Sequence, residues 1–442
     1  MNWKKIFSSY IMHIITWALR IAIGATFIIS GLSKMIDVWG FTYLIEQYVN
    51  VWGWELTRPL IVIAAMSISA IEFILGCMLA TGCYKRSSAW ITTLIMIVML
   101  PLSAYIMIEN PVDHCGCFGD FMIISNSTTF YKNVAITIGL IYLCFFNKRT
   151  FGLFFPYIQW MPAIACYIYI MIIGLVGYNL QPLVDFRPYK VGTHLYNDST
   201  SVDEPQFNFI YEKNGVKETF TIDNLPDSTW TFVDRSEINS DSLKADTTPQ
   251  LSIYDLNDNE VTANVIASQG EQIILLIPEI KYADISYSFL TNEMYNYIKK
   301  RNGSMIGIFA TNDKDQIKPW VDRSLTLWPT YTAEDTSIKE IARGKVSVVY
   351  LKDGIIQWKR TLTSIPTDVF SSDDKENAFD KLYLQKNKYY NFTYFTHIFT
   401  AIILIIFAIN LFFVAVKFIF SRLNKKKNVT LHSENKDIDK KN

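Results

Sequence analysis

Residues 59–80 read PLIVIAAMSISAIEFILGCMLA and contain a single ionisable side chain, Glu72. An α-helix rises about 1.5 Å per residue, so this stretch is long enough to cross the roughly 30 Å hydrocarbon core of a bilayer. Five further apolar runs occupy residues 11–30, 88–108, 130–146, 161–178 and 394–420. The sequence therefore predicts a multi-span α-helical membrane protein and excludes a single soluble globule.

The composition of the 442 residues agrees with this class. Half of the residues are hydrophobic, and 41 basic residues balance 41 acidic residues. This balance disfavours a nucleic-acid-binding protein, which carries a basic surface. Six cysteines are too few for a fold that depends on disulfides. We therefore expect the bilayer, and not nucleic acid, to be the main partner.

Lysine and arginine next to membrane spans are retained on the cytoplasmic side. If all six runs cross, both termini are cytoplasmic and residues 181–391 lie outside. The first run is not expected to be a cleaved signal peptide, because it contains Arg20 and no small-residue cleavage site follows it. The cations that lie on the inner side in this arrangement are Lys4, Lys5, Lys85, Arg86, Lys148, Arg149, Arg422, Lys425, Lys426 and Lys427.

The outer segment between the fifth and sixth runs contains no cysteine. Its first part, residues 181–250, has short alternating stretches at 207–211 and 218–222, separated by the turn signal Asn214-Gly215. Its second part, residues 251–391, predicts strands at 272–277, 304–310, 345–351 and 355–360, with helices at 286–300 and 314–324. The turn Asp353-Gly354 joins the last two strands as a hairpin.

This order resembles a thioredoxin-like fold over residues 271–363. The chain departs from that family where its C-x-x-C and its proline are expected, since residues 279–287 contain no cysteine and Arg343-Gly344-Lys345 replaces the proline. We therefore expect an α/β thioredoxin-like domain that performs no thiol chemistry and binds another protein or the membrane part. An unrelated α/β domain with the same element order is the alternative.

A cysteine motif lies between the third and fourth runs. Cys115 and Cys117 are close enough along the chain for a reducible disulfide, and thiol–disulfide exchange is the leading interpretation. His114 is expected to favour the reactive thiolate, and the glycines permit unusual backbone angles. Two alternatives are a soft metal bound by both cysteines and His114, and a disulfide that only shapes the loop. The full motif is Asp113-His114-Cys115-Gly116-Cys117-Phe118-Gly119-Asp120.

Ionisable groups inside a membrane require partners. Arg20 and Glu72 are at similar depths when counted from the cytoplasmic ends of their runs, which predicts an ion pair between adjacent antiparallel helices. One interpretation is that this pair holds the bundle together. The other is a polar pocket, formed by Arg20, Glu72 and Lys34, for a quinone headgroup or another small ligand. The four remaining cysteines, which are expected to be buried as small hydrophobic residues, are Cys77, Cys83, Cys144 and Cys166.

Residues 12–146 resemble the DoxX and MauE families of four-helix membrane proteins. The resemblance rests on the stretches 19–24 and 27–34, on Glu72 with Gly76, and on Cys115-Gly-Cys-Phe-Gly119. The whole chain is similar to long DoxX-like proteins of the Bacteroidetes that append a thioredoxin-like domain. The resemblance implies a protein of the bacterial cytoplasmic membrane that is linked to electron transfer or to disulfide formation in exported proteins.

These observations predict six segments. They are a four-helix domain at 1–150, a fifth span at 151–180, a β-rich segment at 181–250, a thioredoxin-like domain at 251–391, a sixth span at 392–421 and a cytoplasmic tail at 422–442. The leading function is a membrane thiol–disulfide redox component, with quinone as a candidate electron carrier. The alternative is a non-catalytic assembly factor whose outer domain binds a client protein. A transporter is a weaker third hypothesis, because no broken helix or inverted repeat is evident.

Overall fold

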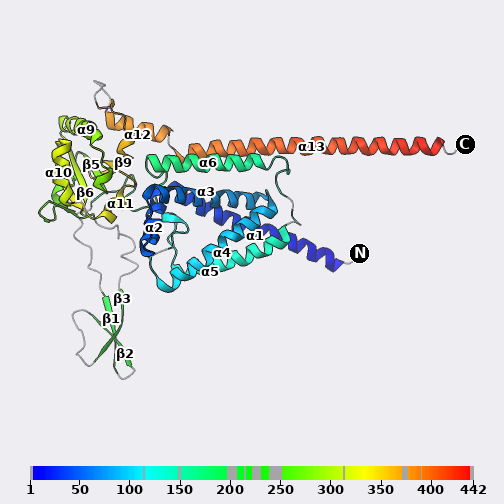
Figure 1. Cartoon of the computed structure of the whole chain (residues 1–442), viewed down its shortest axis with the longest axis horizontal. Coiled ribbons are helices and arrows are strands. Elements are labelled where there is room, and N and C mark those ends of the chain that lie inside the picture. The colour runs from blue at the N-terminus through cyan, green and yellow to red at the C-terminus, as the bar shows by residue number, and fades with distance from the viewer. Residues whose placement is uncertain are drawn as a thin grey trace. The chain divides into compact units, whose positions relative to one another are not determined.

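The protein is described by a computed structural model that covers residues 3–112, 115–147, 150, 152–196, 207–213, 216–221, 230–237, 251–311, 314–370, 377–389 and 391–438. The chain forms two compact units (Figure 1). One unit comprises Met1–Phe186 and Asp380–Asn442, and the other comprises Arg187–Phe379. The first unit is helical and the second contains the β-strands.

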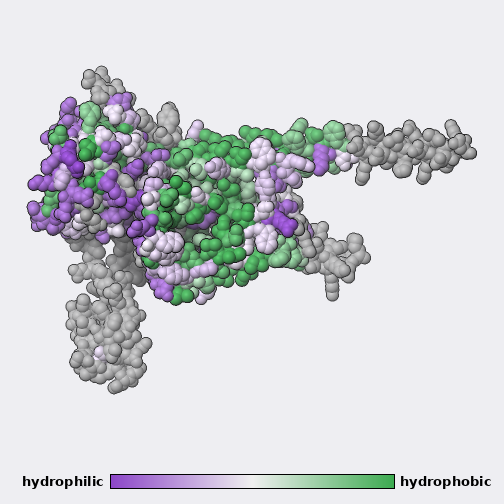
Figure 2. Space-filling model, in the orientation of Figure 1, coloured by the Kyte–Doolittle hydropathy of each residue, from purple (hydrophilic) through white to green (hydrophobic). Residues whose placement is uncertain are grey.

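Six helices of the described residues are long and apolar enough to cross a membrane, and each coincides with one predicted run. Figure 2 shows hydrophobic side chains covering their outer surface, as expected for helices that face lipid. The prediction of a multi-span membrane protein is therefore confirmed. The helices are α1 (Trp3–Ile36), α3 (Arg58–Thr81), α4 (Lys85–Glu109), α5 (Asn126–Phe146), α6 (Trp160–Asn179) and α13 (Phe392–Ile438).

A further helix, α2 (Val38–Val51), occupies most of the loop that was expected between the first two spans. The side chain of Asp37 caps it by accepting a hydrogen bond from Gly40 N at 2.9 Å. Trp39 and Tyr48 are buried on its inner face. α2 therefore covers one end of the bundle. A short 3₁₀ turn, η1 (Gly119–Phe121), follows α4.

Glycines set the register between the antiparallel helices α1 and α3. A Cβ at Gly31 would lie 2.5 Å from backbone atoms of Ser69 and Phe73, and a Cβ at Gly24 would lie 2.9 Å from Ala80. The two backbones can approach this closely only because these positions lack side chains. This register determines which polar residues of α1 and α3 can meet.

The second unit contains a six-stranded sheet of order β4-β7-β6-β5-β8-β9. β5 and β6 are parallel, whereas β8 is antiparallel to β5 and to β9. The order β6-β5-β8-β9 is that of a thioredoxin-like core, which confirms the predicted fold class. The elements of this part of the unit are β4 (Ile253–Tyr254), α8 (Thr262–Val265), β5 (Glu271–Ile277), η4 (Ile280–Tyr282), η5 (Ile285–Tyr287), α9 (Ser288–Lys300), β6 (Ser304–Ala310), α10 (Lys314–Ser324), β7 (Thr330–Ala333), α11 (Asp335–Ile341), β8 (Ser347–Lys352), β9 (Ile355–Thr361) and η7 (Leu362–Ser364). α12 (Ala378–Tyr389) begins at the end of the second unit, and most of its residues belong to the first.

The predicted hairpin is confirmed, with Asp353 and Gly354 at φ values of 53° and 74°. The sequence analysis did not predict β4, β7 or α11. β7 has only four residues, and its sequence, Thr330 to Ala333, gives too short a pattern to distinguish a strand from a loop.

A separate antiparallel sheet of order β2-β1-β3 confirms the strands expected in the β-rich segment. Its strands are β1 (Phe207–Lys213), β2 (Val216–Thr221) and β3 (Thr231–Glu237). The predicted turn at Asn214 and Gly215 lies outside the described residues.

Candidate functional site

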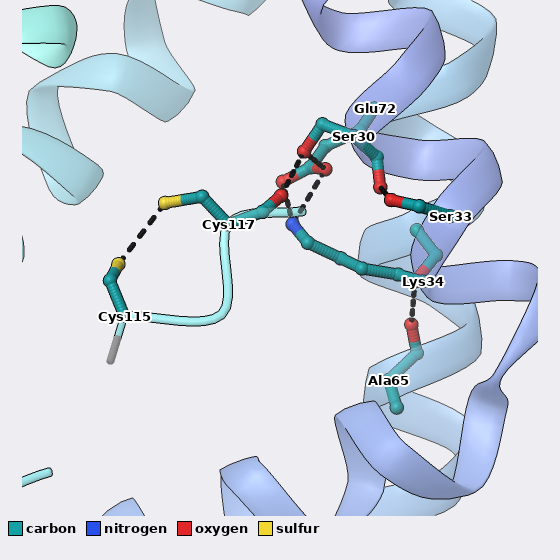
Figure 3. A network of polar contacts seen from close by, with 8 residues as sticks. Ser30, Ser33, Lys34, Ala65, Glu72, Cys115 and Cys117 are labelled. Carbon is teal, nitrogen blue, oxygen red and sulfur yellow. Dashed lines mark hydrogen bonds and ion pairs between the residues drawn. The ribbon is translucent and has the colours of Figure 1, made fainter. Parts of the chain in front are cut away.

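The candidate site is the cysteine loop between α4 and α5. Cys115 is buried, and Cys117 is partly buried. Both are free thiols, and their Sγ atoms are 3.1 Å apart in a hydrogen bond (Figure 3). Asp113 and His114 lie outside the described residues, so the roles expected for them remain predictions.

Two glycines give this loop its shape. Gly116 has φ +66°, and a Cβ there would collide with Cδ2 of Leu44 on α2. Gly119 has φ +54° and lies against the backbone of α1 at Ser33 and Lys34. Both φ values are unfavourable for residues with a Cβ. The loop can therefore hold the two thiols together while it packs closely on α1 and α2. Asp120, the last residue of the motif, lies in η1 and is partly buried.

The two thiols differ in acidity. The pKa of Cys117 is lowered to about 6, mainly by the hydrogen bond from Cys115 and also by the positive charges of Lys132 and Lys34. The same hydrogen bond, together with burial, raises the pKa of Cys115. At neutral pH the pair therefore consists of a Cys117 thiolate and a Cys115 thiol. This combination provides a nucleophile and a neighbouring thiol that can displace a partner from it.

A buried pair of side chains, Lys34 and Glu72, lies directly beneath the loop. Nζ of Lys34, on α1, lies 2.9 Å from Oε1 and 2.8 Å from Oε2 of Glu72, on α3. Lys34 is 2% exposed and Glu72 is 5% exposed. Ser30 Oγ contacts Glu72 Oε2 at 2.8 Å and the carbonyl oxygen of Cys117 at 2.5 Å (Figure 3). Ser30 thus connects the ion pair to the cysteine loop.

A cavity of about 30 Å³ connects the same groups. Its polar lining includes Glu72, Lys34, Cys117 and Asn133, whereas α4 contributes the apolar side chains Ile95, Met96 and Met99. Lys132, also on the lining, places its ammonium group over the Phe118 ring, 4.4 Å from the centroid. The cavity is large enough for one or two water molecules.

The predicted ion pair between Arg20 and Glu72 is wrong. Arg20 donates from Nε to the Leu79 carbonyl oxygen at 3.1 Å and from Nη1 to Thr150 Oγ1 at 2.9 Å. Its guanidinium also lies 4.4 Å above the Trp17 ring centroid. In the register between α1 and α3, Arg20 is level with Gly82, whereas Glu72 is level with Ser30. Residues 20 and 30 are about 15 Å apart along a helix axis.

The depth count assumed that the first run begins level with the end of the second run, whereas Ala80 is level with Gly24, 13 residues after Ile11. At its other end, α1 extends beyond the first run to Ile36. The extension brings Lys34, which the six-run count placed in an outer loop, into a helix beside Glu72. Of the three residues expected in the polar pocket, the structure thus brings Glu72 and Lys34 together and leaves Arg20 apart.

The sequence analysis missed Ser30, Lys132 and Asn133. A signal was present, since Ser30 and Lys34 are four residues apart and therefore share a helix face. Lys132 and Asn133 interrupt the start of the fourth apolar run, and that position places them near the cysteine loop. Polar residues near the ends of the predicted spans could therefore have indicated that these side chains belong to the site.

The four other cysteines belong to apolar clusters, as expected. Cys77, Cys83 and Cys166 lie in the cluster around α6, and Cys144 lies in the cluster around α5. Among the residues that the structure describes, no group of three His, Cys, Asp or Glu side chains could bind a metal. The alternative of a soft metal bound with His114 remains a prediction, because His114 is not among them.

Two larger hollows are lined by other residues than the thiols. A groove of about 460 Å³ runs between α6 and α13 and is lined by apolar side chains such as Ile168, Phe399 and Ile402. A pocket of about 210 Å³ in the second unit is lined by Ala283, Ser288, Trp320, Lys345 and other residues. It lies between the start of α9 and the segment before β8, where thioredoxin-like folds carry their C-x-x-C and proline.

Within the helical unit, residues 12–146 match the family described as methylamine utilisation protein MauE. Residues 12–146 are a MauE-family domain. The domain contains α2 to α5, most of α1 and the whole cysteine loop, so every residue of the site described above, from Ser30 to Asn133, belongs to it. This confirms the resemblance to the MauE family that was inferred from the sequence motifs, whereas the resemblance to DoxX stays a prediction.

Outside the MauE-family domain, residues 205–238 match a domain of unknown function. The solution structure of a thiol:disulfide interchange protein from Bacteroides sp. is similar at 14% identity, with a TM-score of 0.23, over 31% of this chain and 84% of that chain. No curated protein matches the chain. The thioredoxin-like assignment of the second unit therefore rests on its strand order.

Proposed function

We propose that this protein is a membrane thiol–disulfide redox component of the bacterial envelope and that Cys115 and Cys117 are its exchanging pair. The observation that supports this most strongly is the contact of 3.1 Å between two free thiols, one of which has its pKa lowered to about 6. A structural disulfide needs neither a free pair nor an activated thiolate. The MauE-family domain around the pair supports a redox-associated role.

The exchange follows from the different acidity of the two thiols. The Cys117 thiolate attacks one sulfur of a partner disulfide, forms a mixed disulfide and releases the first partner thiolate. Cys115 then loses its proton and attacks Cys117 Sγ. The bond between Cys115 and Cys117 forms as the second partner thiolate leaves and takes up a proton. The pair loses two electrons, and the partner gains them.

The distribution of positive charges places the cysteine loop on the outer side of the cytoplasmic membrane in this proposal. Both termini are then cytoplasmic. An oxidising compartment is where disulfides form and persist, so the partner is an exported protein or another redox protein of the envelope.

The volume of the cavity beside Glu72, where a quinone headgroup or another small ligand was expected, favours an occupant smaller than a quinone. The cavity beside Glu72 measures about 30 Å³, whereas a cavity that binds benzene measures about 150 Å³. The apolar groove between α6 and α13 has enough volume for a quinone ring, about 460 Å³. We propose this groove as the location if a quinone serves the protein, and no step of the exchange above depends on it.

The test is to trap the mixed disulfide in cells. A Cys115→Ser variant lacks the resolving thiol, so it should accumulate Cys117 in mixed disulfides that reducing agents release. A Cys117→Ser variant should accumulate none. Labelling of both cysteines by a membrane-impermeant alkylating reagent only after mild reduction would support the outer location. The absence of adducts in both variants contradicts the proposed exchange.

A second function is supported by the pocket of about 210 Å³ in the thioredoxin-like unit. In this alternative the protein is a non-catalytic assembly factor that binds a client there, and the cysteines only shape their loop. Such a factor should keep its function in the Cys115→Ser, Cys117→Ser double variant and lose it when residues 181–391 are removed. A redox component should lose function in the double variant.

A further inference from the structure

Three oxygen atoms below the cysteine loop require a proton that an ionised Glu72 does not provide. Ser30 Oγ is 2.8 Å from Glu72 Oε2 and 2.5 Å from the Cys117 carbonyl oxygen (Figure 3). A hydroxyl group donates a single proton, and carbonyl and carboxylate oxygens only accept. If Glu72 is ionised, one of the two contacts joins two oxygens with no proton between them. A protonated Glu72 donates to Ser30, and Ser30 donates to Cys117, so that both contacts are satisfied.

The charges around the site give a reason for this proton. Two electrons added to the Cys115–Cys117 disulfide, together with one proton, would leave a thiolate in addition to the Glu72 carboxylate. Two negative charges would then lie in a site where Lys34 and Glu72 are almost fully buried. Burial of charge is expensive unless it is compensated. Lys34 is the almost fully buried cation of the site, and Lys132 is only partly buried. A second proton on Glu72 leaves one thiolate, which Lys34 can then balance.

The groups that face Glu72 support this arrangement. α1 contributes Lys34 and Ser30, the loop contributes Cys117, and α5 contributes Lys132 and Asn133 to the common cavity. α4 contributes only apolar side chains to it. Besides the two lysines, Glu72 and Cys117 are the titratable groups among the residues that line this cavity.

The cavity also offers a route between these two groups. Asn133 is 4% exposed, and its Nδ2 has no hydrogen-bond partner within the part of the chain that the structure describes. A buried amide normally has a partner, and this one lines a cavity of water size that Cys117 and Glu72 share. A water molecule accepting from Asn133 would connect the thiol to the carboxyl group.

We propose that Glu72 is the redox-linked proton acceptor of the cysteine pair. When the disulfide is reduced, two electrons and two protons are taken up. The S–S bond breaks, Cys115 becomes a thiol, Cys117 becomes a thiolate and the Glu72 carboxylate becomes a carboxylic acid. Oxidation returns both protons, and Glu72 again forms an ionised pair with Lys34. This inference rests on the proposed exchange function and assigns to Glu72 the uptake of one of its protons.

The test is the pH dependence of the midpoint potential, measured on the full chain in detergent with dithiothreitol redox buffers and alkylation of free thiols. Each proton taken up changes the equilibrium constant tenfold per pH unit, which is about 30 mV for a two-electron couple. Above about pH 6.5, where Cys117 is ionised, the wild type should show about 60 mV per pH unit. Glu72→Gln should show about 30 mV per pH unit.

A second variant addresses the chance that Glu72→Gln fails to fold with Lys34 unpaired. Ser30→Ala keeps the ion pair and removes the hydroxyl that shares the proton, so its slope should also fall towards one proton. Infrared difference spectra of reduced minus oxidised protein provide an independent readout. A protonated carboxyl band should appear on reduction in the wild type and be absent in Glu72→Gln.

Equal slopes in the wild type and both variants, or no carboxyl band on reduction of the wild type, would overturn the inference and leave the exchange function standing. If Cys115 and Cys117 are not reversibly oxidised and reduced at any pH, the exchange function is contradicted, and the inference about Glu72 is contradicted as well.

Discussion

Glu72 of α3 pairs with Lys34 of α1, at 2.8 Å, and not with Arg20 of the same helix. The pair is almost fully buried, and Ser30 links it to the backbone of the cysteine loop. This buried pair, on two helices that glycines bring close together, thus supports the loop that carries the thiols. Lys34 and Glu72 therefore contribute both to the stability of the bundle and to the surroundings of the thiols.

Removing one partner of this pair should destabilise the protein more than removing both. Lys34→Met or Glu72→Gln alone leaves a buried group without its partner, which typically costs about 3–5 kcal/mol. The Lys34→Met, Glu72→Gln double variant should recover a large part of this loss. Thermal unfolding in detergent would measure all three variants.

The half-buried pair of Arg58 and Glu46 offers a matched control on the same bundle. Its single variants, Arg58→Met and Glu46→Gln, should lose about 1 kcal/mol or less, because both side chains keep contact with water and ion pairs near the surface contribute little. Equal losses for the two pairs would contradict the importance assigned to burial of Lys34 and Glu72.

Alkylation of Cys117 should report its lowered pKa. A thiol reacts as the thiolate, so the rate in the wild type should be half-maximal near pH 6. Cys115→Ala removes the hydrogen bond that is the main cause of the shift, and the pKa should rise towards the ordinary value of about 8.5. At pH 7 the thiolate fraction would then fall about 30-fold. A rate profile that Cys115→Ala leaves unchanged would show that the hydrogen bond does not control acidity.

The sequence was sufficient for the parts of the fold that depend on long, strong patterns. Six apolar runs predicted six helices, and the alternating strands with the Asp353-Gly354 turn predicted the thioredoxin-like core. The cysteine motif was found because two cysteines one residue apart are distinctive in any sequence. Short elements such as β7 were missed, because four residues carry too little pattern.

The partners of Glu72 could not be predicted in the same way. Which residue of α1 meets it depends on the register between two helices, and this register is set by glycine contacts at Gly24 and Gly31. A shift of ten residues on α1 separates the expected partner from the level of Glu72. Composition and hydropathy do not determine such a shift, since any register would bury similar apolar area.

Gly116→Ala should disturb the cysteine pair through packing as well as backbone strain. Gly116 and Gly53 both have φ +66°, but a Cβ at Gly116 would collide with Leu44, whereas nothing lies within 4 Å of a Cβ at Gly53. Both alanine variants should lose about 1 kcal/mol from the unfavourable φ. Only Gly116→Ala should also change the alkylation profile of Cys117. Identical profiles in the two variants would mean that the contact with Leu44 does not hold the loop.

Arg20→Met should weaken the bundle without altering the thiols. Arg20 is fully buried and donates to the Leu79 carbonyl oxygen and to Thr150, far from Ser30 along α1. Loss of these charge-assisted hydrogen bonds should lower the thermal unfolding temperature and the free energy of unfolding by about 2–4 kcal/mol. The alkylation profile of Cys117 and the pH slope of its midpoint potential should equal those of the wild type. Thr150→Val, which removes one acceptor, should give a smaller loss of stability and the same thiol behaviour. A change in either thiol measurement in Arg20→Met would instead link Arg20 to the site of Glu72 and Lys34, which its described contacts with Leu79, Thr150 and Trp17 do not suggest.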